Sequence, residues 1–335
     1  MRVTQSITDR LYHKNNNRML NAMLKNQTRI YTGKQYLRAS EDAINASKAM
    51  TVRRQLRDLD MYDDNLKSAK SVYSAAETNL TTLSHDIYLD VQTQLETACN
   101  GTYNQDDLNI FAQKIEEFAT LAVETMNVSF AERQLFGGSN NTETPFTVET
   151  GVDADGNTFH TVSYNGLVLN DNDDPSLYPG SKPVYVDIGI GIQYDSNYEV
   201  NPQTAADVSF NGAKVLGCGI ADDGYSKNYI QLMYDAADAL KKGDVAKANG
   251  TLDRLNMANT NVLTEITTLG SKQNSMDFYI EKNADYRYSL QERQNDVEGA
   301  DLNEEITQME STDAAYQAIL QLSSRILPKS IFDFV

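Results

Sequence analysis

The stretch that decides the fold is residues 59–87, LDMYDDNLKSAKSVYSAAETNLTTLSHDI. Its apolar residues recur every seven positions, and a second apolar set is offset from the first by three. The first set is Leu59, Leu66, Tyr73, Leu80 and Ile87, and the second is Tyr62, Ala69, Ala76 and Leu83. This spacing is typical of a coiled-coil-like helix rather than of an ordinary amphipathic one. The sequence therefore predicts a long helix with one apolar seam.

The residues before this seam predict where the helix begins. Ser40, followed by Glu41 and Asp42, is expected to cap it, because a short hydroxyl accepts from exposed N–H groups and acids favour the positive end of the helix dipole. A helix from residue 41 to about residue 98 would be roughly 87 Å long. A break at residues 99–107 and an apolar stripe at residues 108–126 follow, so the first half is predicted to be a helical hairpin.

The C-terminal half of the chain repeats this pattern. Residues 252–297 carry a similar seam, which Asn259, Gln273 and Asn283 interrupt, and residues 302–327 carry a final apolar stripe. We expect the seams of 59–87 and 252–297 to bury each other. The N-terminal stripe is broken by KNNNR at residues 14–18, so it needs a partner helix, and the last 30 or so residues are the obvious candidate.

The middle of the chain is rich in turns. Twelve of the 18 glycines and five of the six prolines fall between Gly137 and Gly224. Segments rich in β-branched and aromatic residues, with Asp155-Gly156 as a hairpin signal, predict short strands there. We therefore predict a mainly α-helical chain with an inserted β-rich domain, in which the N- and C-terminal segments pack together as an elongated, coiled-coil-like helical rod. The predicted parts are terminal assembly helices at 1–38 and 300–335, the helical rod at 39–138 and 222–299, and the β-rich outer domain at 139–221.

Composition excludes several classes of function. With 29 basic and 47 acidic residues the net charge is -18, so the average field repels nucleic acid and anionic membranes. No stretch approaches the roughly 18 apolar residues of a membrane span, and the N-terminus lacks the apolar block of a secretory signal peptide. The two cysteines, Cys99 and Cys218, are not spaced as metal or redox pairs are. We expect neither a nucleic-acid partner nor membrane insertion.

The sequence contains no recognisable catalytic or ligand-binding motif. Gly33-Lys34 lacks the upstream glycine and the following Ser or Thr of a phosphate-binding loop, so we predict a helix C-cap at Gly33. His13, His85 and His160 have no ligand spacing. The prediction is a protein that is not an enzyme, with no catalytic residue, no cofactor and no metal site. The open alternative is an enzymatic or metal-binding outer domain, which a tightly bound metal in the purified protein would favour.

The two ends of the chain predict assembly. The first and last roughly 35 residues have amphipathic stripes but too little interior of their own, so self-assembly or assembly with a partner would complete their burial. The stripe geometry gives the expected contact residues. They are Val3, Ile7, Leu11, Leu320, Ile326, Leu327 and Phe332.

Residues 32–80 resemble the N-terminal signature of the flagellin superfamily. Its elements occur here as Thr32-Gly33-Lys34, as Ala39-Ser40-Glu41-Asp42 and as Ala76-Glu77. The C-terminal stretch is similar to the matching terminal helix of that family, with Asp313 to Ala318 at its Tyr-Gln-Ala core and Ile331 to Val335 as its apolar end. The junction ERQLFGGSNNTETPF, residues 132–146, resembles the hook-associated branch, in which Phe-Gly-Gly leads to a Thr-x-Pro-Phe strand.

This resemblance implies a structural adapter of the bacterial flagellum that joins the hook, through hook-associated protein 1, to the flagellin filament. Its terminal helices would be mobile in the monomer and would order in the inner core of the flagellum. The implied partners are hook-associated protein 1, flagellin, copies of the chain in a ring-like layer, and a flagellar export chaperone. The implied location is the extracellular hook-filament junction, reached through the flagellar type III apparatus without a cleaved signal peptide. The alternative is flagellin, the bulk filament subunit.

Overall fold

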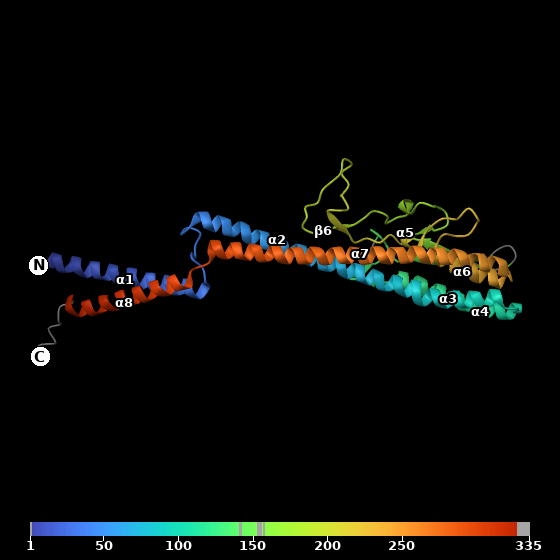
Figure 1. Ribbon diagram of the computed structural model, residues 1–335. Coiled ribbons are helices and arrows are strands. Elements are labelled where there is room, and N and C mark those ends of the chain that lie inside the picture. The colour runs from blue at the N-terminus through green and yellow to red at the C-terminus, as the bar shows by residue number, and fades with distance from the viewer. Residues whose placement is uncertain (1, 141–142, 153–155, 157, 327–335) are drawn as a thin grey trace. The chain divides into compact units, whose positions relative to one another are not determined.

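The computed structural model describes residues 2–140, 143–152, 156 and 158–326. The chain is mainly helical, with long helices toward both ends and short strands between them (Figure 1), which confirms the mainly α class with a β-rich insert. It forms two compact units. The first unit consists of residues up to Leu59 and from Ala284 onward, and the second runs from Asp60 to Asn283.

Helices account for most of the described residues, and none of them is long and apolar enough to cross a lipid bilayer. They are α1 (Arg2–Thr32), α2 (Ala43–Thr81), the π-helix η1 (Thr82–Ile87), α3 (Tyr88–Asn100), α4 (Gln105–Met126), the short 3-10 helix η2 (Pro175–Leu177), α5 (Gly212–Leu216), α6 (Tyr229–Lys241), α7 (Val245–Glu298) and α8 (Leu302–Ile326).

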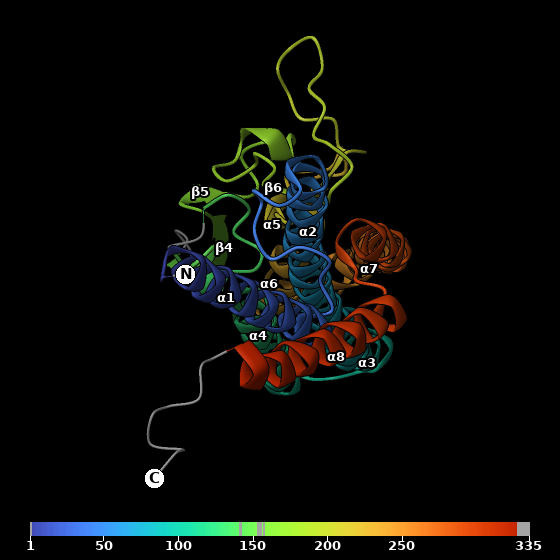
Figure 2. The ribbon, with the colours of Figure 1, turned by 90° about the vertical axis from the view of Figure 1, so that its left-hand side faces the viewer.

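The first and last helices pair within the first unit. Helices α1 and α8 lie side by side and antiparallel in both Figure 1 and Figure 2. Arg29 of α1 donates to a carboxylate oxygen of Glu305 in α8, at 2.9 Å. The predicted pairing of the N-terminal stripe with the C-terminal segment is thus confirmed. Helix α1 also continues through residues 14–18, because a packed partner supports a segment whose own propensity is weak.

The turn between α1 and α2 corrects one prediction. Gly33 follows α1 with a φ of 64°, a left-handed conformation that suits glycine, so the predicted C-cap is confirmed. The predicted Ser40 cap is wrong. Helix α2 begins at Ala43, and Oδ1 of Asp42 accepts from the backbone N–H of Asn45 at 3.0 Å. Glu41 belongs to the preceding turn, so Asp42 is the last side chain that can cap the helix.

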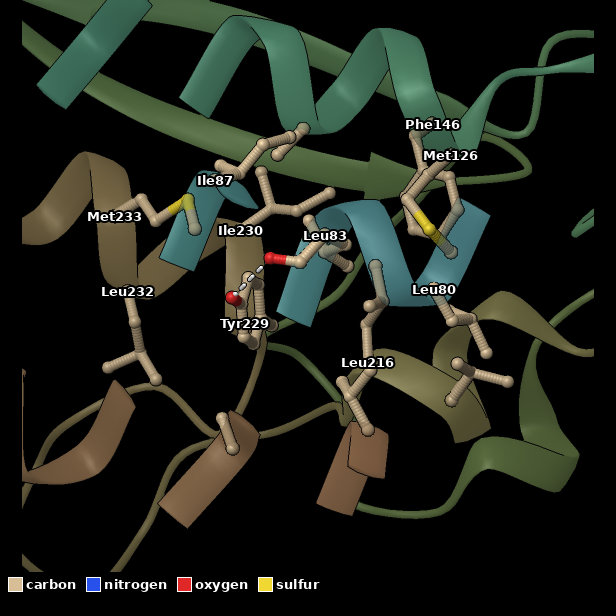
Figure 3. Packing of buried hydrophobic residues seen from close by; sticks show 14 of the residues in the cluster. Leu80, Leu83, Ile87, Met126, Phe146, Leu216, Tyr229, Ile230, Leu232 and Met233 are labelled. Atoms are coloured by element: carbon tan, nitrogen blue, oxygen red, sulfur yellow. Dashed lines mark hydrogen bonds between the residues drawn. The ribbon is translucent and has the colours of Figure 1, made fainter. Parts of the chain in front are cut away.

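The predicted continuous helix from 41 to 98 is interrupted by the π-helix η1. Up to Ile87 the buried positions alternate by three and four residues, but Val91 and Leu95 follow at intervals of four. A π-helical turn contains one more residue than an α-helical turn. The extra residue in η1 therefore lets Val91 and Leu95 of α3 stay on the buried side of the helix. The hydroxyl of Tyr229 donates to the carbonyl of Leu83 within η1 at 3.1 Å (Figure 3), and burial raises the pKa of Tyr229.

In the second unit the two heptad seams share one core. Leu66 and Leu80 are buried in the same cluster as Leu255 and Leu269, but Ile115 of α4 and Leu232 of α6 belong to this cluster too, so the two seams lie in a core that they share with other helices rather than being buried by each other alone. Two of the polar interruptions also find partners across the seam. Gln273 donates to a Glu77 carboxylate oxygen at 2.5 Å, and Asn283 donates to Asp63 at 3.1 Å. These bonds favour one register of the two helices.

The β-rich insert consists of three small antiparallel sheets. The strands are β1 (Ser129–Phe130), β2 (Arg133–Gln134), β3 (Phe146–Val152), β4 (Thr158–Tyr164), β5 (Leu167–Val168), β6 (Tyr185–Asp187) and β7 (Ala205–Asp207). Strands β3 and β4 form the predicted hairpin, and β5 extends it. The backbone N–H of Val162 in β4 donates to the buried side chain of Gln231 in α6 at 2.8 Å, so the hairpin is fixed to the helical core.

The Phe136-Gly137-Gly138 element has a steric explanation. Phe136 is fully buried, and the chain passes so close to its neighbours that side chains would not fit at the two following positions. A Cβ atom on Gly137 would lie 2.2 Å from the carbonyl oxygen of Asn140, and one on Gly138 would lie 2.0 Å from that of Gly180. Both glycines are therefore required where helix α4 gives way to the insert.

The β1–β2 turn leads to a stability prediction. Ala131 and Glu132 connect the paired residues Phe130 and Arg133 and have φ values of 51° and 63°, as in a type I′ turn. Non-glycine residues are strained in this conformation. We expect the pair Ala131→Asn and Glu132→Gly to raise the free energy of unfolding of the second unit by about 1 kcal/mol in urea titrations. An unchanged or lower stability would show that the turn is not strained.

Candidate assembly interface

The α1–α8 pair carries the exposed apolar residues that the sequence predicted as assembly contacts. Ile7 and Leu11 are four residues apart on one face of α1, and their exposed fractions are 53% and 54%. Leu320 of α8 is 44% exposed. Leucine and isoleucine side chains held in water in this way are candidates for burial by another chain.

The other predicted contact residues are placed less completely. Val3 and Ile326 belong to α1 and α8, and the structure describes only their backbone. Leu327 and Phe332 lie outside the described residues. The seven-residue contact set therefore stays a prediction, for which the structure supplies three exposed side chains on two paired helices.

The first unit exposes further large apolar side chains that the sequence analysis did not single out. They are spread over α1, the turn after it, the start of α2, the end of α7 and α8. They are Leu24, Tyr31, Leu37, Ile44, Met50, Tyr286, Tyr288, Leu302 and Ile306. Ile44 and Met50 could have been found from the sequence. They are apolar residues of α2 that do not lie on the face that the helix buries. Their exposure extends the surface available for assembly beyond the two stripes.

The first unit also buries polar atoms that lack hydrogen-bond partners among the described residues. These atoms are Oδ1 of Asn16, Nε of Arg29, Oη of Tyr36 and Oε2 of Glu305. A buried polar atom without a partner costs free energy, and native structures satisfy nearly all of them. These four atoms therefore make the first unit less stable than a fully hydrogen-bonded one would be.

The joint, which we define as residues 33–42 together with 298–301, is organised around one buried carboxylate. Nε and Nη2 of Arg53 donate to the two oxygens of Glu298, the first at 2.7 Å, in a bidentate ion pair. The Glu298 side chain is 5% exposed, and Nζ of Lys34 lies 3.8 Å from it. Burial raises the pKa of Glu298, but the hydrogen bonds from Arg53 and Gln294 and the charges of Arg53 and Lys34 together outweigh this effect, so the pKa is lower than usual.

Backbone hydrogen bonds join the two sides of the joint. Gln35 donates to the carbonyl of Glu298 at 2.8 Å, and Ala300 donates to the carbonyl of Gly33 at 2.9 Å. The Gly33-Lys34 pair therefore forms part of a structural connection between the N-terminal and C-terminal segments. Sequence reasoning missed Arg53 and Glu298, because they are 245 residues apart in the sequence and neither belongs to a motif.

One group among the described residues brings three possible metal ligands together. Glu116, His160 and Asp238 each place a ligand atom within 4.8 Å of the other two. They come from α4, β4 and α6 of the second unit. The sequence search for ligand spacing could not find them, because such spacing identifies only ligands that are close in the chain.

The comparisons with known proteins agree with this fold. Residues 3–141 match the model of the bacterial flagellin N-terminal helical region. A candidate flagellar hook-associated protein from Vibrio parahaemolyticus is 16% identical, with a TM-score of 0.60 over 77% of this chain and 100% of that chain. Bacillus cereus FlgL is 16% identical, with a TM-score of 0.51 over 73% of this chain and 99% of that chain. No curated protein sequence matches the chain.

These matches concern different aspects of the molecule. The flagellin model covers the segment from α1 to the β1–β2 hairpin, whereas the two solved structures match most of the fold. At 16% identity the structural likeness establishes the fold alone. Residues 3–141 are thus similar to the bacterial flagellin N-terminal helical region, and the chain has the fold of the flagellar hook-associated proteins to which it is similar.

Proposed function

We propose that this protein is a structural adapter of the bacterial flagellum, of the FlgL or hook-associated protein 3 type, which joins the hook to the flagellin filament. The observation that carries the proposal is the α1–α8 pair, in which the two helices lie side by side and Ile7, Leu11 and Leu320 remain exposed. The fold similarity to a candidate hook-associated protein and to an FlgL supports it. The role is structural, and the proposal assigns no catalytic residue.

The proposed partners follow from the same surface. Hook-associated protein 1 on one side and flagellin on the other would cover the apolar residues of the first unit, and copies of the chain would form a ring-like layer. The predicted contacts Val3, Ile7, Leu11, Leu320, Ile326, Leu327 and Phe332 would lie in these interfaces. Burial of apolar side chains that are exposed in the monomer supplies the free energy for such assembly.

The proposal keeps the predicted division of the chain. Residues 1–38 and 300–335 would form the inner core, residues 39–138 and 222–299 the surrounding layer, and residues 139–221 the outward-facing domain. The terminal helices would be mobile in the free monomer and would order on assembly, which suits a chain that passes an export channel unfolded. Export would use the flagellar type III apparatus and a flagellar chaperone, with the extracellular hook-filament junction as the destination.

Immunogold electron microscopy of intact flagella separates this proposal from the flagellin alternative. An antibody against residues 142–205 would recognise the insert, where Tyr194 and Tyr198 are exposed. We expect label confined to the boundary between hook and filament. Label along the whole filament would instead identify a bulk filament subunit, and unlabelled flagella would contradict both assignments.

A further inference from the structure

Glu116, His160 and Asp238 form a compact cluster where the β3–β4 hairpin meets helices α4 and α6. Nδ1 of His160 lies 3.2 Å from a carboxylate oxygen of Asp238 and 3.7 Å from one of Glu116. The side chains are 13%, 11% and 20% exposed in the order His160, Asp238, Glu116. One imidazole nitrogen thus faces two carboxylates in a largely buried place.

These distances are close to those of a metal site. A tetrahedral Zn²⁺ with bonds of about 2.0–2.2 Å sets neighbouring ligand atoms about 3.4 Å apart. Two sides of the triangle lie near that value, and the third, between the two carboxylates, is at most 4.8 Å. Small side-chain movements would therefore bring all three ligand atoms within bonding distance of one ion.

Each of the three side chains is held in place by a further contact. The ring of His160 stacks on that of Tyr234, with centroids 4.7 Å apart. The backbone N–H of His160 donates to the second oxygen of Asp238 at 3.2 Å. Lys241 donates to Oε1 of Glu116, the same oxygen that faces Nδ1 of His160, so an ion bound to that oxygen would replace this ammonium group. The ring stacking and the backbone hydrogen bond orient His160 and Asp238, as such contacts do for the ligands of metal sites.

The cluster can be reached from solvent. Glu116, His160 and Tyr234 line a groove of about 740 Å³ along α4, which also exposes Thr120 and Thr150 to the same space. Burial raises the pKa of Asp238, and the adjacent imidazole opposes part of that effect. Two carboxylates outnumber the one lysine in the cluster, so the electrostatics of this place favour a bound cation.

We propose that Glu116, His160 and Asp238 form a divalent transition-metal site, with an imidazole and two carboxylates as protein ligands and a fourth position open to the groove. An imidazole ligand favours Zn²⁺ over Ca²⁺ or Mg²⁺, which prefer sites made only of oxygen. The ion would connect α4, β4 and α6 and so stabilise the attachment of the insert to the helices. This site is separate from the assembly surface, and its failure would leave the adapter proposal intact.

Isothermal titration of the tag-free, full-length protein with ZnCl₂ tests the site. We expect one Zn²⁺ per chain, and Ca²⁺ at the same concentration should not displace it. His160→Gln and Asp238→Asn should each weaken binding at least tenfold, since each removes one charged or strongly coordinating ligand. The double variant His13→Ala with His85→Ala leaves His160 as the only histidine and should bind as the wild type does.

Every other result overturns the site. The absence of Zn²⁺ binding by the wild type would show that the cluster is only an ion pair that fixes the hairpin. Retained binding in His160→Gln, or lost binding in the double histidine control, would place the ion elsewhere. The wild-type titration decides the proposal even where a variant fails to fold. The midpoint of thermal unfolding of each variant, measured without metal, shows whether the variant is folded. Weaker binding by a variant that unfolds at the wild-type temperature is then due to the missing ligand and not to a loss of stability.

Discussion

Replacing Ile7 and Leu11 by Asp is expected to abolish incorporation of the protein into flagella while leaving its fold intact. Both side chains are exposed in the monomer, so the substitutions should change the free energy of unfolding by about 0.5 kcal/mol or less each. In an interface, two large apolar side chains contribute about 3–6 kcal/mol, which corresponds to a loss of affinity of more than about a hundredfold. Filaments per cell, counted by electron microscopy in a strain that lacks the native gene, measure the effect.

The matched control adds the same charges elsewhere on the same helix. Asn15 and Asn17 are exposed on α1, and the pair Asn15→Asp with Asn17→Asp introduces two carboxylates without removing an apolar side chain. This control should assemble normally. The Ile7→Asp, Leu11→Asp variant should still reach the culture medium, which separates failed incorporation from failed export. Normal filament numbers in that variant would show that this face of α1 makes no essential contact.

The second large effect is expected at the joint. Arg53→Met should destabilise the first unit by about 2 kcal/mol, because it leaves the nearly buried Glu298 carboxylate without its bidentate partner. Removing one partner of a fully buried pair costs about 3–5 kcal/mol, but the Arg53 side chain is 40% exposed, and water replaces part of the interaction. Hydrogen exchange of the amides at the start of α2 and the end of α7, which belong to the first unit but not to the terminal helices, measures this loss.

Two further variants test the cause. Arg53→Met combined with Glu298→Met should recover most of the stability, since no buried carboxylate remains, and Lys34, which also lies near Glu298, is 47% exposed and stays hydrated. Arg54→Met replaces an exposed neighbouring arginine and should have little effect. A loss as large in Arg54→Met as in Arg53→Met would show that the ion pair is not responsible.

The contribution of Glu298 should also depend on pH. Its pKa is lowered in the folded protein, so the carboxylate stabilises the fold at neutral pH, and this stabilisation is lost as the pH falls through the folded-state value. The difference between the wild type and Glu298→Gln should therefore be largest at neutral pH and should shrink in acid, below the usual range of a carboxyl group.

Periodicity alone predicted most of the helical architecture. The seam at 59–87 and its counterpart at 252–297 each bury a line of apolar residues, and this spacing is visible in the sequence because a helix repeats it locally. The predictions that were wrong concern details that depend on the contacts of a residue in the folded chain. Asp42 rather than Ser40 caps α2, because the preceding turn includes Glu41. The π-helix was missed, because its signal is only a change from three-four to four-four spacing at Ile87.

The candidate sites could be predicted only in part. The exposed stripe residues Ile7 and Leu11 followed from helical spacing, since the apolar residues of an amphipathic helix that its partner helix does not cover stay in contact with water. The Arg53–Glu298 pair and the Glu116–His160–Asp238 cluster could not be predicted, because their members come from elements that only the folded chain brings together. Residues that are far apart in the sequence cannot be recognised as one site from the sequence alone, even when their side chains are typical of an ion pair or a metal site.

The construction of the first unit from both chain ends determines the order in which the molecule can fold. Arg29 and Glu305 are 276 residues apart in the sequence, so α1 cannot meet α8 until all the residues between them have been synthesised. The second unit lies within residues 60–283 and can fold before that moment. Because synthesis proceeds from the N-terminus, α1 waits longest with its apolar face in water. We expect the first unit to close last, and a nascent chain to be most prone to aggregation through α1 during that interval.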